Sequence, residues 1–174
     1  MKAVHICLSF CVSLTIGDYT VTTSNLSVSG ISSISDLNVV LNISHSWNSD
    51  LRVFVISPTG RQVELFSEAG IGGKGFINTT LDDEVGTSIN NGSGTFSGTY
   101  KPFGRLSDFD GLNATGIWKL KIIDAAEGDT GKLNSWSLIV NGTPPTGNLT
   151  KYGTSGNDTL TGGSSGKFTS RGDE

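Results

Sequence analysis

Short runs of alternating apolar and polar residues, separated by turn residues, recur through most of this chain and restrict the folds open to it. The clearest run is WKLKIID, in which Trp118, Leu120 and Ile122 alternate with Lys119 and Lys121. A β-strand turns successive side chains to opposite faces of a sheet, so this run predicts a strand with one buried and one solvated face. No segment longer than a turn shows the helical period. The chain is therefore expected to be all-β.

Turn residues connect these runs at short intervals. Glycine is abundant, at 24 residues, and supplies the positive φ values that tight turns need. The buried run LRVFVIS closes in SPTG at 57–60, where proline presets φ, and RQVELF then returns as a partner strand. Many short strands joined by turns predict an antiparallel β-sandwich with jelly-roll topology.

Composition divides the chain into three parts. Residues 1–11 hold one lysine and a short apolar stretch that His5 interrupts, and they are expected to be a leader or an extraneous N-terminus. Residues 12–141 carry the strand signals and form the expected domain. Residues 142–174 are rich in Pro, Gly, Ser and Thr, which predicts a flexible tail. No apolar run approaches the roughly 20 residues of a membrane span, so none is expected.

Charge and histidine content exclude some classes of function. The formal net charge of −4 comes without a basic stripe, so nucleic-acid binding is not expected. The two histidines, His5 and His45, are accompanied by no Gly-x-Ser-x-Gly nucleophile motif. We therefore interpret His45 as a half-exposed strand residue rather than a catalytic base, and we expect no catalytic residues in this chain.

Acidic residues gather in loops, where they favour a hard cation. The segments SEAGIGGKG, LDDE and SDFDG supply the candidate metal ligands Glu68, Asp82, Asp83, Glu84, Asp108 and Asp110. Calcium prefers about six to eight oxygen ligands on adaptable loops, and a divalent cation would relieve the repulsion between these carboxylates. On an extended strand Asp83 points away from Asp82 and Glu84, so a bend is needed to gather all three. The spacing is not that of an EF-hand, and the alternative is a set of solvated acidic loops.

Four further residues each allow two interpretations. Asp124 and Asp129 flank the last hairpin connection, where they bind a second cation or, as we favour, accept backbone N–H bonds in the turn. Trp118 and Trp136 are stacking platforms for a sugar or, as their alternation indicates, core residues. Trp47, beside the polar run NSD, is the tryptophan expected to be exposed.

Ordered motifs cover most of the expected domain. They lie in DLRVFVISPTGRQVEL at 50–65, TFSGTYKPFGRLSDFDGLNATGIWKLKIID at 95–124 and GDTGKLNSWSLIV at 128–140. They comprise a strand ending in Ser-Pro-x-Gly, a Phe-x-Gly element, Gly-x-Trp-x-Leu and a closing Gly-Asp-x-Gly-x-Leu-x-x-Trp-x-Leu. In this order they resemble the P domain, or P/homo B domain, which follows the subtilisin-like catalytic domain of proprotein convertases such as kexin and furin. The LDDE and FDG elements look like the bacterial branch of the family.

The resemblance implies a non-catalytic accessory domain that stabilises and modulates an extracellular, calcium-dependent subtilisin-like serine protease. Its expected partner is a subtilisin-like catalytic domain in cis or another extracellular protein. Its expected location is secreted or at the cell surface. Such a domain would present an apolar patch to its partner on one face of the sandwich.

A second resemblance supports an alternative function. The tail segment GTSGNDTLTGG at 153–163 looks like one unit of the RTX calcium nonapeptide repeats. It favours a stand-alone protein- or polysaccharide-binding module of a large secreted or surface bacterial protein. A polysaccharide binder would show exposed aromatic side chains in a groove rather than an apolar patch.

Overall fold

The computed structural model describes residues 4–145, and this part of the chain consists of strands, turns and three short 3-10 helices. The strands are β1 (Val4–Ile16), β2 (Val21–Val28), β3 (Ser33–His45), β4 (Leu51–Ile56), β5 (Gln62–Ser67), β6 (Phe76–Leu81), β7 (Phe96–Tyr100), β8 (Gly116–Asp124) and β9 (Gly131–Thr143). The 3-10 helices are η1 (Asn48–Asp50), η2 (Ile89–Asn91) and η3 (Leu106–Phe109). The all-β prediction is confirmed. Within the described part, no helix is long and apolar enough to cross a membrane.

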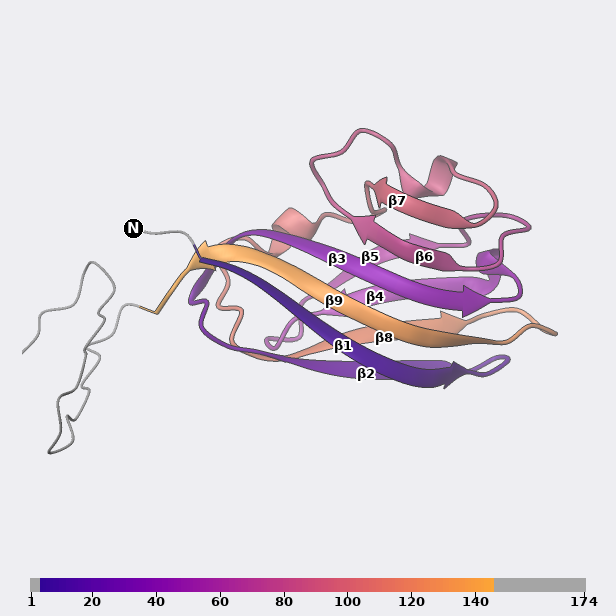
Figure 1. The fold of residues 1–174 in the computed structure, drawn as a ribbon, viewed down its shortest axis with the longest axis horizontal. Helices are drawn as coiled ribbons and strands as arrows, with labels where there is room; N and C mark the ends of the chain where they lie inside the picture. Colours follow the sequence, from indigo (N-terminus) through magenta and orange to yellow (C-terminus); the bar gives the residue numbers. More distant parts are fainter. Residues whose placement is uncertain (1–3, 146–174) are drawn as a thin grey trace, which may run out of the picture.

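The strands form two sheets that pack face to face, as Figure 1 shows. One sheet has the order β1-β9-β3-β6-β7 and the other the order β2-β8-β4-β5. The expected sandwich is therefore present, and the jelly-roll assignment stays a prediction. One strand pair departs from the antiparallel expectation, because β6 and β7 are parallel. Parallel neighbours need a crossover, and residues 82–95, which include η2, supply it.

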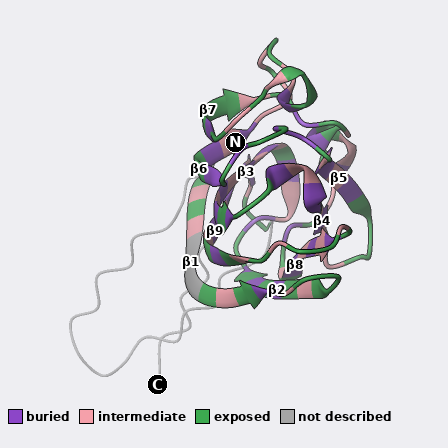
Figure 2. Cartoon of the chain, turned by 90° about the vertical axis from the view of Figure 1, so that its right-hand side faces the viewer, coloured by how far each residue is buried: buried purple, intermediate pink, exposed green. Residues whose placement is uncertain are grey.

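Buried side chains fill the space between the sheets. Figure 2 colours the buried residues purple along both sheets. The alternation predicted for β8 is confirmed, since Trp118, Leu120 and Ile122 are fully buried. Trp136 of β9 is also in the core, and its indole Nε1 donates to Ser24 Oγ of β2 at 2.9 Å. This hydrogen bond joins the two sheets through the core. The prediction of two core tryptophans is thus confirmed.

The sheet begins before the expected domain boundary at residue 12. Strand β1 pairs antiparallel with β9 from Val4, opposite Gly142, to Ile16, opposite Gly131. Ile6 and Leu8 of this strand pack against the core, which gives the segment a reason to join the sheet. Residues 4–11, expected to be a leader or an extraneous N-terminus, are thus part of β1 in this structure. The RTX-like unit of the tail lies outside the described residues.

Candidate functional site

The segment LDDE bends away from the sheet directly after β6, as the gathering of its carboxylates requires. Asp82 Oδ1 accepts a hydrogen bond from the backbone N–H of Glu84 at 2.8 Å, which closes the turn. Asp83 Oδ2 accepts one from the backbone N–H of Ser107 at 2.8 Å. Ser107 belongs to η3, so this bond ties the acidic turn to the segment that carries Asp110. Two acidic segments separated by a strand and a crossover are therefore brought together.

Two residues of β3 that were not predicted from the sequence also belong to this cluster. Asn38 donates from Nδ2 to Asp82 Oδ2 at 3.3 Å. Asp36 accepts from Asn141 Nδ2 at 2.7 Å and lies close enough to Glu84 to act on its charge. Both residues alternate with core residues of their strand, which marks them as outward-facing. Their position beside LDDE depends on the pairing of β3 with β6, which no local pattern encodes.

These contacts and charges connect six residues, which we call the acidic site. They are Asp36, Asn38, Asp82, Asp83, Glu84 and Asp110. Like charges in the acidic site act on one another. The pKa of Asp110 is raised above its ordinary value, first by partial burial and then by the charges of Asp36 and Asp83. The pKa of Glu84 is raised mainly by a hydrogen bond with the side chain of Asp82, and further by partial burial and by Asp36. Negative charge at the acidic site is therefore incompletely balanced.

Two oxygen atoms of the acidic site are buried without a hydrogen-bond partner. They are Oδ1 of Asn38 and Oδ1 of Asp83. An amide oxygen and a carboxylate oxygen are both ligands that calcium accepts, and an orphaned buried oxygen is costly unless something binds it. Across residues 4–145, however, no three His, Cys, Asp or Glu side chains converge closely enough to hold an ion between them. The acidic site thus contains oxygen atoms that a cation could use as ligands, but these atoms do not form a complete coordination shell.

The two remaining candidate ligands are paired with arginine. Glu68 accepts from Arg52 at 2.8 Å, beside the four-stranded sheet. Asp108 accepts from Arg105 at 3.2 Å, although it lies only two residues from Asp110 in the sequence. Four of the six predicted metal ligands thus lie in the acidic site without converging on one point, and Glu68 and Asp108 have other partners.

His45 is buried, which corrects the interpretation of a half-exposed strand residue. Its Nε2 lies 3.0 Å from Oδ2 of Asp124, and neither side chain has exposed area. Its Nδ1 lies 2.8 Å from the backbone oxygen of Trp47. Asp124 Oδ1 also accepts from the backbone N–H of Ala126 at 3.3 Å, the turn-stabilising role expected for it. Neither side chain of this pair is exposed to solvent.

A further carboxyl lies near this pair. Asp50 of η1 is 7% exposed. Burial is the main cause that raises its pKa, and the charges of Asp129 and Asp124 add to it, while His45 opposes them. Several acidic groups, two of them buried, thus lie close together at the end of the sandwich that contains η1 and the β8–β9 turn.

The two packed sheets and their tryptophan-rich core define an all-β sandwich domain. Residues 34–140 match the family model described as the proprotein convertase P-domain. This match covers more than half of the 174-residue chain, and the chain belongs to that family. The resemblance noted in the sequence is confirmed.

Solved structures share the fold. One is the crystal structure of the Aeromonas sobria serine protease and chaperone complex, with a TM-score of 0.57 and 20% identity over 83% of this chain and 28% of that chain. Another is the serine protease of Aeromonas sobria, with a TM-score of 0.56 and 20% identity over 82% of this chain and 27% of that chain. The present chain therefore corresponds to less than a third of the length of these proteins. Comparison with curated proteins gives no match.

Proposed function

We propose that this chain is a non-catalytic accessory domain that packs against the catalytic domain of an extracellular subtilisin-like serine protease and stabilises it. The observation that carries the proposal is the match of residues 34–140 to the P-domain family. The similarity in fold to part of a bacterial serine protease supports it. The test is whether the chain slows the heat inactivation of such a catalytic domain.

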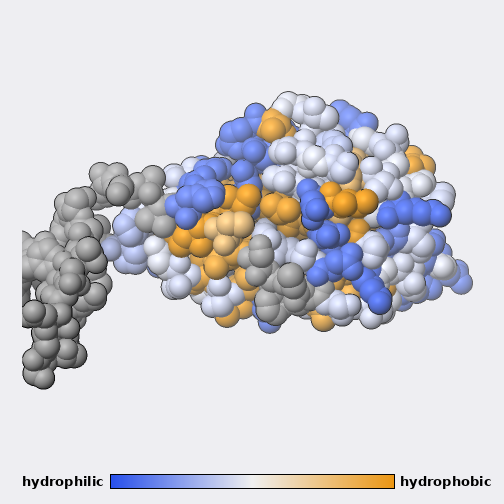
Figure 3. All heavy atoms as spheres, viewed as in Figure 1, coloured by the Kyte–Doolittle hydropathy of each residue, from blue (hydrophilic) through white to orange (hydrophobic). Residues whose placement is uncertain are grey.

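An apolar surface on the five-stranded sheet supports this proposal. Figure 3 shows apolar colour gathered over β1, β9 and β3 on the face opposite the core. Cys7, Val40 and Ile139 alternate with inward-facing residues of these strands and retain exposed area. Apolar area left on a sheet face is typical of a surface that contacts a partner. We propose this face as the one that contacts the catalytic domain.

We also propose that the acidic site binds a structural calcium ion. The supporting observation is the pair of buried oxygens, Asn38 Oδ1 and Asp83 Oδ1, that lack hydrogen-bond partners. The carboxylates of Asp36, Asp82 and Asp110 would complete an oxygen-rich set, which suits calcium better than softer metals. The pKa of Glu84 is raised first by its hydrogen bond with Asp82 and that of Asp110 first by burial, and the ion would offset the neighbouring negative charges that add to both shifts.

Calcium is expected to raise the melting temperature of the chain, and to do so more near neutral pH than in acid. At about 100 times its dissociation constant the ion adds about 2.7 kcal/mol, which corresponds to a shift of roughly 5–10 °C. The ion needs ionised carboxylates, whereas the raised pKa values of Glu84 and Asp110 favour protonation as pH falls. Thermal unfolding with calcium and with chelator, at about pH 7.5 and about pH 5, measures both effects.

Two matched variants separate the acidic site from general charge effects. Asp83→Asn removes a charge beside an orphaned oxygen and should abolish the calcium shift. Asp108→Asn removes the same charge from a residue paired with Arg105 and should retain it. Equal melting temperatures of the wild-type chain with calcium and with chelator at both pH values would show that the acidic loops are merely solvated.

A further inference from the structure

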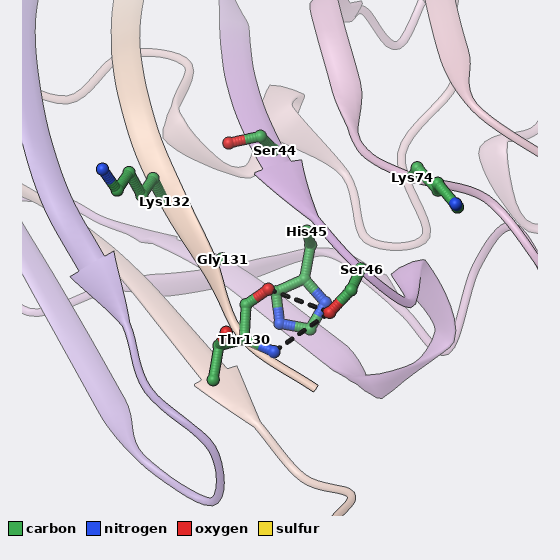
Figure 4. Close-up of a pocket in the computed structure, with 7 residues that line it drawn as sticks. All are labelled: Ser44, His45, Ser46, Lys74, Thr130, Gly131 and Lys132. Atoms are coloured by element: carbon green, nitrogen blue, oxygen red, sulfur yellow. Dashed lines mark hydrogen bonds between the residues drawn. The ribbon is translucent and has the colours of Figure 1, made fainter. Parts of the chain in front are cut away.

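A polar pocket of about 310 Å³ lies where the end of β3 meets the start of β9, beside the glycine-rich loop that precedes β6. Figure 4 shows its walls, which carry the hydroxyl groups of Ser44, Ser46 and Thr130. His45 lines it as well, but its side chain has no exposed area because it faces Asp124. The lining therefore offers hydroxyl and backbone groups and no apolar side chain to a ligand.

Backbone packing and one pair of hydrogen bonds preform this pocket. Gly131 pairs with His45, and a Cβ atom at Gly131 would lie only 2.3 Å from the backbone oxygen of Ser44. A side chain at this position is thus excluded, and the close packing of β3 on β9 beside the pocket requires glycine here. Ser46 Oγ donates to the carbonyl of Thr130 and accepts from its N–H, both at 3.1 Å (Figure 4). The wall is therefore held in place without a ligand.

Two lysines line the pocket in a chain of net charge −4. Lys74 comes from the glycine-rich loop and Lys132 from β9, and Figure 4 shows them on opposite sides of the pocket. The ion pairs formed by the described residues are His45–Asp124, Arg52–Glu68 and Arg105–Asp108, so neither ammonium group has a carboxylate partner there. Unpaired cations on both sides of a hydroxyl-lined hollow favour an anionic ligand.

We propose that this pocket binds an acidic polysaccharide, with the sugar carboxylates at Lys74 and Lys132 and the sugar hydroxyls on Ser44. Trp47 directly follows Ser46 and is 43% exposed, which places an aromatic platform for a sugar ring at the same end of the sandwich. An acidic peptide is expected to bind more weakly, because no apolar side chain lines the pocket to contact its side chains. This inference goes beyond the accessory role and does not depend on it.

Titration calorimetry of the chain with a hyaluronan hexasaccharide at low ionic strength, where charge interactions are least screened, tests the proposal. We expect saturable binding, weakened at least about tenfold in the Lys74→Ala/Lys132→Ala variant, which corresponds to about 1.4 kcal/mol. Trp47→Ala should weaken binding as well. Neutral maltohexaose should bind at least about tenfold more weakly than the acidic sugar.

The matched control is Lys119→Ala/Lys121→Ala, which removes two lysines from the outer face of β8 and should leave the affinity unchanged. The proposal fails if the hexasaccharide gives no binding heat at millimolar concentration. It also fails if the control weakens binding as much as the pocket variant does. Equal affinity for an acidic hexapeptide would overturn the saccharide assignment in favour of a general carboxylate site.

Discussion

Replacing His45 with alanine is expected to lower the free energy of unfolding by about 3–5 kcal/mol. The substitution removes the partner of Asp124, whose side chain has no exposed area. A buried carboxylate without its partner keeps the full cost of its removal from water. Asp50 feels the negative charges of both Asp124 and Asp129, and the loss of the imidazole of His45 removes the group that opposes them.

Urea unfolding at neutral pH measures this effect. The double variant His45→Ala/Asp124→Ala should be less destabilised than the sum of the two single variants, because it leaves no uncompensated buried group. His5→Ala is the control, since His5 is exposed and bonds Asn141 on the sheet surface. A loss below about 1 kcal/mol for His45→Ala would show that this pair is not a structural element of the fold.

Replacing Trp118 with alanine is expected to cost about 3–5 kcal/mol. The indole is fully buried and packs edge-on against Phe109, with ring centroids 5.0 Å apart. Its Nε1 also donates to the carbonyl of Ala114 at 2.8 Å, and the substitution leaves this carbonyl without that donor. The cavity and the lost hydrogen bond act in the same direction.

The exposed tryptophan provides the matched control for this substitution. Trp47→Ala removes the same side chain from a position that is 43% exposed, and it should change stability by no more than about 1 kcal/mol. Both variants are compared by the midpoint and slope of urea unfolding. Similar destabilisation in the two variants would contradict the assignment of Trp118 to the core.

Local patterns were sufficient to predict the all-β class and the core tryptophans, but not the strand structure of residues 4–11. The alternation around Trp118 identified the buried face of β8 because a strand repeats every two residues whatever its neighbours are. The parallel pairing of β6 with β7 was not predicted, because strand partners depend on crossovers rather than on strand sequence. Register between distant strands is likewise absent from any short window.

The same limit explains the outcome for the candidate sites. Asp82 and Asp83 were recognised because they are adjacent in the sequence, whereas Asp36 reaches them only through the pairing of β3 with β6. His45 was interpreted as a half-exposed strand residue because its partner, Asp124, lies 79 positions away. Side-chain pairs between distant strands decide which polar residues of a sandwich are buried.

The measurement that tests the account most directly is the heat inactivation of a subtilisin-like catalytic domain from the same organism, with and without this chain. Residual hydrolysis of a chromogenic peptide gives the half-life at one fixed temperature. The accessory role predicts a half-life at least about fivefold longer with the chain, which corresponds to about 1 kcal/mol in the barrier to inactivation.

Two surface variants define where the protection arises. Ile139→Lys, on the proposed contact face of β9, should abolish it. Ile117→Lys, on the outer face of the other sheet where the side chain is 48% exposed, should preserve it. An unchanged half-life with the wild-type chain at saturating concentration would contradict the accessory role.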